Sequence, residues 1–225
     1  MKLERQQIID AAIGLLDEVG LDDLTTRRLA DRLHVQQPAL YWHFASKRAL
    51  VNAMGQEILR RHHTYEVPRP GDDWRRFIGE NARSLRRALL AHRDGGRLHA
   101  GAEAEVEDFV RLESQLRCLV DAGFPVEIAT LALISAGRFA LGSAIDEQAE
   151  QAEERVWGQE ELAAAAAKLP LFGKSLRYYR KNGPEAAFEA GLTLIVAGLE
   201  VELAGAKRKR RARAGARKAR KASAG

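Results

Sequence analysis

The stretch LTTRRLADRLHVQQPALYWHFASKRALVNAM, residues 24–54, decides the fold class. Thr25 can cap a helix that turns Leu29 and its apolar neighbours inward and leaves arginines outside. The short turn LHVQQ leads to Pro38, which is favoured at the first position of a helix because its missing N–H is not needed there. Ser46 can cap a longer helix that follows. Helix, short turn and helix is the order of a helix-turn-helix, so we expect DNA binding at this end.

Three consecutive rings, Tyr41, Trp42 and His43, stand out in the second of these helices. Leu40 and Phe44 form an i, i+4 pair and supply the buried face, so the three rings cannot all belong to the core. One alternative is that Tyr41 and Trp42 pack against neighbouring helices. We favour the other, in which the exposed face enters the DNA major groove, which accepts one helix.

Each polar residue around the rings has an expected role. Gln37 is expected to contact a base edge, while Tyr41 and His43 donate to phosphates. Lys47 and Arg27 are expected to hold the DNA backbone beside them. Apolar ring edges would touch thymine methyl groups.

Helical spacing continues through the remainder of the chain, and strand signals are nearly absent. The break VPRPGDDW, residues 67–74, is the expected domain boundary. HRDGGRLHAGA is expected to be a glycine-rich turn, and WGQEELAAAAAKLP a loosely specified connection, although its alanine run is helical by propensity. The expected helices cover residues 4–19, 25–33, 38–44, 47–63, 74–91, 105–122, 126–154, 171–181 and from 184 onwards.

Composition restricts the class of protein. The 225 residues are 46% hydrophobic and 30% charged, which is typical of a globular protein. No run approaches about 20 uninterrupted apolar residues, and the N-terminus lacks a secretion signal, so we expect a cytoplasmic protein without membrane contact. Cys118 is the single cysteine, which excludes an internal disulfide and a cysteine metal cluster.

Charge is divided unevenly along the chain. Residues 206–225 hold ten basic residues and no acid, so the other 205 residues carry 26 basic residues against 31 acids, a net charge of −5. Such a basic block is expected to be disordered. It could serve solubility alone, or it could contact DNA phosphates without choosing a sequence.

The expected helix from Pro184 is apolar on more than one side. Phe188 and Leu192 lie on one face, while Leu194 and Val201 extend the apolar surface. A helix of this kind must be covered on more than one side. We favour a homodimer interface here over a central core helix.

The pattern in residues 24–54 resembles the tetracycline repressor family. Segments such as NARSLRRALLAHRDGGRLHAG and PEAAFEAGLTLIVAGLE extend the resemblance through the regulatory domain, to all but the basic tail. It implies an all-α homodimer that binds a palindromic operator and releases it when a small-molecule inducer binds the larger domain. Residue Ala39 departs from the Thr common in the family, which removes one hydroxyl contact. The positions that match operator contacts, with Ala39 among them, are Thr26, Arg27, Gln37, Pro38, Ala39, Tyr41, Trp42, His43 and Lys47.

The resemblance also implies a drug site that accepts Mg²⁺ together with the drug and needs no other cofactor. His99 matches the histidine that holds the metal, and Asp146 stands where a Glu reaches it through water. A motif lost here reads Ala102, Glu103 and Ala104, so a hydroxyl and a guanidinium are missing. Leu85 replaces a Phe, and Arg138 stands where a His would be and could hold an anionic ligand instead. The positions that match ligand contacts are His63, Asn81, Leu85, His99, Gln115 and Arg138.

Residue chemistry alone would assign none of these ligand positions. His62 and His63 are adjacent on a helix, so their rings point about 100° apart and cannot easily share an ion. His99 could equally be a hydrogen-bonded turn histidine. Mg²⁺ prefers oxygen ligands, so one His and one Asp form a site only when the drug supplies oxygens.

The sequence therefore predicts an all-α protein with an N-terminal three-helix helix-turn-helix domain, joined by a long helix to a larger ligand-binding and dimerisation domain. The expected parts are residues 1–63, 68–205 and the basic tail 206–225. We expect a ligand-responsive repressor acting on double-stranded operator DNA, with a tetracycline-like inducer or another polycyclic or anionic compound. A nucleoid-type DNA binder would leave the second domain idle, and an enzyme is disfavoured because no catalytic constellation is recognisable.

Overall fold

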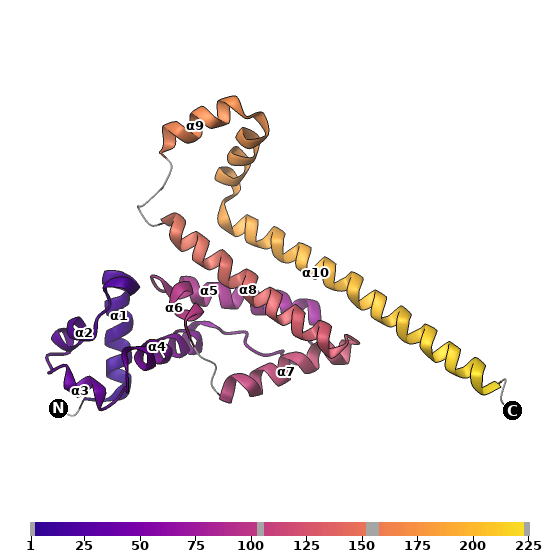
Figure 1. Ribbon diagram of the computed structural model, residues 1–225, viewed down its shortest axis with the longest axis horizontal. Helices are drawn as coiled ribbons and strands as arrows, with labels where there is room; N and C mark the ends of the chain where they lie inside the picture. Colours follow the sequence, from indigo (N-terminus) through magenta and orange to yellow (C-terminus); the bar gives the residue numbers. More distant parts are fainter. Residues whose placement is uncertain (1–2, 103–105, 152–157, 223–225) are drawn as a thin grey trace.

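The computed structural model describes residues 3–102, 106–151 and 158–222, which form helices and no strand (Figure 1). The helices are α1 (Arg5–Asp23), α2 (Thr26–Leu33), α3 (Pro38–Tyr41), α4 (Lys47–His62), α5 (Trp74–Leu90), α6 (Gly95–Ala100), α7 (Val106–Ala122), α8 (Val126–Gln151), α9 (Gln159–Lys168) and α10 (Pro170–Ala222). The all-α prediction is confirmed, with a small N-terminal group of helices, the head, beside a larger group, the core.

The head is formed by α1–α3 and the first part of α4, and its local signals are those expected from the sequence. Thr25 accepts a hydrogen bond from the Arg28 amide at the start of α2. Ser46 accepts one from the Ala49 amide at the start of α4. Gly20 interrupts α1 with a φ of 78°, a left-handed conformation that glycine adopts without strain.

The core is built on the contact between α5 and α8. The face of α8 that packs inward is a stripe of small residues: Ala129, Ala132, Ala136, Ala140 and Ala144. Alanines at i, i+3 and i+4 spacing allow close approach of two helices. Phe77 of α5, Phe124 before α8 and Phe188 of α10 fill the apolar cluster around them.

Helix α8 is long and apolar enough to cross a membrane by length and composition alone, a property that a core helix shares. Its inner face is the buried alanine stripe, and its outer face exposes Leu131 and Ile134. Helix α10 exposes Leu194 and Val201 in the same way. Each of the two helices therefore exposes apolar side chains that one chain leaves uncovered.

The structure differs from the expectations in the turn and the tail. The expected glycine-rich turn contains helix α6, whereas residues 159–168 of the expected connection form helix α9, in line with the helical propensity of their alanine run. The basic tail 206–225, expected to be disordered, continues α10 as a helix to Ala222. Alanine, lysine and arginine all have high helix propensity, which outweighs the repulsion between the tail's cations.

Close packing explains why glycines occur inside α6. A Cβ atom added to Gly95 would lie 2.3 Å from the Leu89 carbonyl oxygen, and one added to Gly96 would lie 2.8 Å from Ile145 Cγ1. These glycines therefore seat α6 against α5 and α8. Leu98, on the other side of α6, is buried in the apolar cluster of the head, so α6 belongs to both parts of the molecule.

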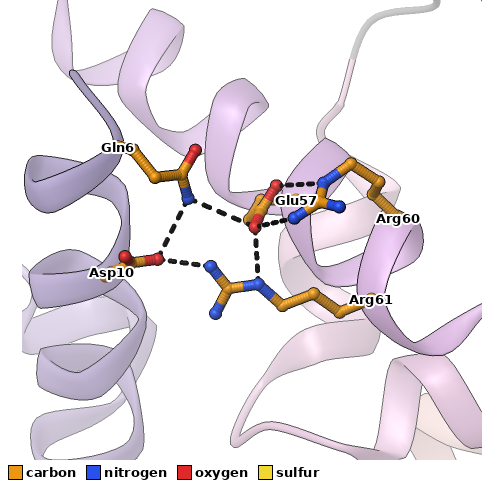
Figure 2. Close-up of polar contacts among 5 residues, drawn as sticks. All are labelled: Gln6, Asp10, Glu57, Arg60 and Arg61. Atoms are coloured by element: carbon orange, nitrogen blue, oxygen red, sulfur yellow. Dashed lines mark hydrogen bonds and ion pairs between the residues drawn. The ribbon is translucent and has the colours of Figure 1, made fainter.

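Polar contacts join the head to the rest of the chain in two places. In the first, α1 meets the C-terminal half of α4 (Figure 2). Gln6 donates to Glu57 at 3.2 Å, Arg61 donates to Glu57 at 2.5 Å, and Arg61 also bonds Asp10. The hydrogen bond from Arg60 holds the pKa of Glu57 to about 2, so this buried carboxylate stays ionised. Helices α1 and α4 are therefore tied together by charge.

The second place, which we call the seam, joins the end of α1 to residues 92–97. The Leu21 amide donates to Asp94 Oδ2 at 2.8 Å. The Arg93 amide donates to Asp17 at 3.0 Å, and His92 Nδ1 lies 2.9 Å from the same carboxylate. Arg97 holds Asp22 through two hydrogen bonds of 2.8 and 3.0 Å. The seam fixes the head against the start of α6.

The glycine packing predicts a large stability difference between two alanine substitutions. Gly95→Ala should lower the free energy of unfolding by about 2 kcal/mol or more, because the new methyl group overlaps the Leu89 carbonyl. Gly205→Ala is the matched control, since it lies on α10 with no atom within 4 Å of an added Cβ. It should be neutral or stabilise by about 0.5–1 kcal/mol. Urea unfolding of both variants measures the difference, and equal stabilities would contradict the packing described for α6.

Candidate functional site

The candidate DNA-recognition surface lies on α3, the residues that follow it and the N-terminus of α2. Leu40 and Phe44 are buried in the head cluster, as expected. Trp42 is 88% exposed and Tyr41 48% exposed, so these two rings do not pack into the head. The regular helix ends at Tyr41, so Trp42 and His43 are presented by the turn after it.

A hydrogen bond between helices holds this surface in shape. The Gln37 side-chain amide donates to the Thr26 hydroxyl at 2.8 Å, which joins α3 to the first residue of α2. His34, in the turn between the helices, has a left-handed φ of 54°, and its amide bonds back to α2. The two helices are therefore set relative to each other before any DNA is present.

The other predicted contacts surround this pair. Arg27, Pro38 and Lys47 are exposed, and Ala39 and His43 are half-buried. Arg27 lies on α2, Pro38 and Ala39 on α3, His43 in the turn after α3 and Lys47 at the start of α4, which the sequence also placed together. A basic and aromatic surface supported by a small apolar cluster can contact both phosphates and base edges.

The candidate ligand site lies where α4 ends. His63 follows the last residue of α4, and its Nδ1 lies 2.9 Å from the hydroxyl oxygen of Ser84 on α5. The same hydroxyl accepts the Tyr65 amide at 3.0 Å. Ser84 is fully buried, so its own hydrogen is satisfied when it is donated to Nδ1. This leaves His63 Nε2 as the N–H donor.

Two amide side chains hold the backbone beside His63. Asn81 of α5 donates to the Tyr65 carbonyl at 2.9 Å and to the Glu66 carbonyl at 3.3 Å. Gln115 of α7 donates to the Glu66 carbonyl at 2.7 Å. The structure thus brings together residues from α4, α5 and α7 that are far apart in sequence. Their side-chain amides satisfy the carbonyls of residues 65 and 66.

His99 contributes to the same site from α6. Its Nδ1 is buried without a hydrogen-bond partner in the described chain. Burial lowers the pKa of His99, while the Asp108 carboxylate acts in the opposite direction. Burial lowers the pKa of His63 to about 4, and His99 is the next largest cause. Both rings are therefore neutral near pH 7, which suits metal binding or hydrogen bonding.

Arg138 and Asp146 do not lie with these residues in one chain. Both are exposed on α8 and line a separate cavity of about 400 Å³ with the stacked rings of Phe139 and Phe188. Leu85 packs partly buried on the core cluster. Ala102 is half-buried at the end of α6, whereas Glu103 and Ala104 lie outside the described residues.

The sequence did not predict several residues that shape the candidate ligand site and the cavity on α8. Ser84 fixes His63, and the backbone of Glu66 receives both amide side chains. Glu66 also lies 3.7 Å from Arg111, and burial raises the pKa of its carboxyl. Arg86 is buried between Glu147 and Glu185 and lies 4.8 Å from the Phe188 ring centre. A serine or arginine on an amphipathic helix gives no signal of such burial.

The residues present fit a metal only in part. Among the described residues no group of three or more His, Cys, Asp or Glu side chains could hold a metal ion. His99 fits as a single ligand because its ring has a buried nitrogen without a partner. Mg²⁺ takes about six oxygen ligands, so a bound molecule and water would have to supply the others.

Family models match both the DNA-recognition part and the ligand-site part of the chain. The family model for the N-terminal domain of "Bacterial regulatory proteins, tetR family" matches residues 8–54. The model "Tetracyclin repressor-like, C-terminal domain" matches residues 67–203, which leaves the basic tail outside. These matches cover the head and the core in turn.

Individual relatives are similar over most of the chain. The tetracycline repressor protein class C of Escherichia coli is 46% identical over 200 residues, 88% of this chain and 91% of the relative. The class A repressor from transposon 1721, also of Escherichia coli, is 47% identical over 198 residues, 88% of this chain and 91% of the relative. A solved structure of class A TetR with 5a,6-anhydrotetracycline and magnesium has a TM-score of 0.69 at 41% identity and covers 88% of this chain and 98% of its own. TetR from Acinetobacter baumannii AYE has a TM-score of 0.75 at 41% identity, with coverages of 88% and 97%.

Burial of His63 predicts a pH dependence of stability. Its folded pKa of about 4 lies below the ordinary 6.5, so the folded state binds fewer protons and loses stability as the pH falls between these values. From pH 7 to 4.5 the wild-type should lose about 2–3 kcal/mol more unfolding free energy than His63→Gln. Urea unfolding at the two pH values measures this. Equal losses in both proteins would show that His63 is not held neutral.

Proposed function

The chain belongs to the tetR family of bacterial regulatory proteins, and on this premise we propose that it represses transcription until a tetracycline-like drug binds with Mg²⁺. The observation that carries the proposal is the convergence of His63, Asn81, Gln115 and His99 at the end of α4. The repressor acts in the cytoplasm, where bacterial DNA is found, and it catalyses no reaction.

The head supplies sequence-specific binding to double-stranded DNA. Gln37 is positioned by Thr26 and contacts a base edge, while Tyr41, Trp42 and His43 present the surface that enters the major groove. Arg27 and Lys47 hold the phosphate backbone beside this surface, and Thr26, Pro38 and Ala39 complete the contact with the operator. Ala39 offers only a methyl group, so the operator differs from one that a Thr hydroxyl would select.

The core supplies ligand binding. His63 donates through Nε2, and Asn81 and Gln115 exchange their backbone partners for polar groups of the drug. His99 provides one nitrogen to Mg²⁺, which neutralises charge on the drug's oxygens. Asp146 contributes to the metal only if the dimer brings it across from α8, since it lies in a separate cavity within one chain.

The exposed apolar faces of α8 and α10 support a homodimer. Leu131, Ile134, Leu194 and Val201 are exposed in one chain, and an apolar surface of this extent is expected to be covered by a second copy. A dimer presents two recognition surfaces, which must lie about 34–36 Å apart to occupy two half-sites of a palindrome.

Helix α6 offers a direct route from ligand to DNA. His99 faces the ligand site, and the preceding residue, Leu98, is buried in the head cluster. The seam joins the start of the same helix to α1 through Asp94 and Arg97. A ligand that draws His99 towards it therefore moves the head. A small tilt at each head is sufficient to lose the half-site spacing.

Helix α4 is the second route. Its 16 residues span about 24 Å between the Ser46 cap in the head and His63 in the ligand site. The Glu57 contacts join α1 to this helix, so the head follows α4 when its C-terminal end shifts. Induction then means that the drug prefers the arrangement in which the two heads are misplaced.

Titration calorimetry with tetracycline, with and without Mg²⁺, tests the proposed ligand. We expect tight binding with Mg²⁺, and at least about tenfold weaker binding in the presence of a chelator, because His99 contacts the drug through the metal. His99→Ala should bind weakly under both conditions, while Ser175→Ala, at an exposed position on α10 away from the proposed contacts, should bind as the wild-type does.

Two results would contradict this ligand. Binding that is independent of Mg²⁺ would remove the metal from the site. An absence of heat under both conditions would favour the alternative, a different polycyclic or anionic ligand in the cavity lined by Arg138. In that case anionic aromatic compounds should bind the wild-type more tightly than Arg138→Gln.

A further inference from the structure

The basic tail is the part of the chain that neither domain explains. It lies beyond the matched residues, and its ten cations face no acid within the same twenty residues. We propose that residues 206–225 are a second, sequence-independent DNA-binding element that holds phosphates away from the bases under the head. This goes beyond the proposed repressor function and does not depend on the identity of the drug.

The structure supports the tail as an accessible cationic helix. Leu203 is buried on the core cluster, and α10 continues beyond it to Ala222. Four consecutive residues, Lys207, Arg208, Lys209 and Arg210, are exposed. At 100° per residue they surround the helix axis with charge. The stems of Lys209 and Arg210 line an open pocket with Phe124 and Ile128, while their residues remain exposed.

The charge density of the tail matches that of DNA. Duplex DNA carries one negative charge per about 1.7 Å of its axis. Ten cations lie between residues 207 and 221, a length of about 21 Å at 1.5 Å per residue. Six of the ten are arginines, whose planar side chains bind phosphate through two hydrogen bonds.

The same composition disfavours a membrane surface as the partner. A helix that lies in a lipid interface needs a face of large apolar side chains. The uncharged residues of the tail are alanine, glycine and one serine. The remaining attraction is electrostatic, and the molecule already acts beside DNA.

The tail is also separated from the recognition surface. Figure 1 shows the C-terminal end of α10 at the opposite end of the molecule from α2 and α3. The phosphates that it holds are therefore distinct from those beside the recognition helix of the same chain. We expect it to strengthen binding to all sequences equally.

The experiment uses the full chain with Lys207→Gln, Arg208→Gln, Lys209→Gln and Arg210→Gln combined. Fluorescence anisotropy measures affinity from 50 to 300 mM KCl for two duplexes: one selected by the wild-type from a random library, and a scrambled one. The slope of log affinity against log salt should become shallower by up to about 7 for the dimer, because four phosphate contacts are lost from each of two tails and each contact contributes about 0.9. At 0.1 M salt both affinities should fall by at least about tenfold, with their ratio unchanged.

A matched variant removes the same charge from the start of α10, where Lys174, Arg177, Arg180 and Lys181 are exposed. Replacing these four by Gln should leave the slope unchanged. Gln37→Ala should lower the ratio of the affinities for the selected and scrambled duplexes and leave the salt slope unchanged. Failure of the recognition surface is therefore distinguishable from failure of the tail.

Four outcomes would overturn the proposal. An unchanged salt slope in the tail variant would leave the tail a role in solubility alone. Equal changes of the slope in both four-residue variants would show that the effect comes from the net charge of the protein and not from the tail. If the tail variant bound the selected and the scrambled duplex equally well, the tail would contribute to sequence specificity, as the nucleoid-type alternative predicts. An unchanged DNA slope with lost binding to vesicles of anionic phospholipid would assign the tail to a membrane.

Discussion

The burial of Leu98 in the apolar cluster of the head is the contact on which the arrangement of the molecule depends. It places one side of α6 in the DNA-binding part, while Gly95 and Gly96 seat the other side against α5 and α8. Helix α6, of only six residues, therefore packs on both the head and the core, so its movement against one disturbs its packing on the other. The hydrogen bonds and ion pairs of the seam reinforce this contact, and helix α4 provides a second connection between the head and the core. Together they explain how a chain with two separate clusters can act as one unit.

The two functional surfaces are prepared to different extents. The recognition surface is held by buried apolar residues and by the bond between Gln37 and Thr26, so it exists before DNA binds. In the candidate ligand site Asn81 and Gln115 donate to the carbonyls of residues 65 and 66. In the proposed mechanism a ligand replaces these bonds with its own, which displaces the segment that follows α4. The free energy of this exchange would then couple ligand binding to the position of the head.

Much of the fold could be predicted because its signals are local. Thr25, Ser46 and Pro38 each act through the backbone next to them, and the structure confirms the helices that they begin. Helix α6 could not be predicted in this way. Its glycines are required by close packing against Leu89 and Ile145, which only the folded chain brings near. The site was predicted by resemblance and not by chemistry: nothing about Ser84 or Glu66 indicates their role until α4, α5 and α7 meet. The tail was expected to be disordered because of its charge, whereas helix α10 runs to Ala222, in line with the high helix propensity of alanine, lysine and arginine.

The central claim is that α6 and the seam transmit ligand binding to the head, and the ratio of operator affinities without and with saturating tetracycline and Mg²⁺ tests it most directly. The wild-type ratio should lie in the range of about 5–150 that typical coupling energies give. Asp94→Gly tolerates the left-handed φ of 56° at this position and removes the acceptor for Leu21, so its ratio should fall towards one while the drug affinity of the free protein is retained. Glu113→Ala, which removes an exposed ion pair on α7, should keep the wild-type ratio. A wild-type ratio in Asp94→Gly would contradict the account.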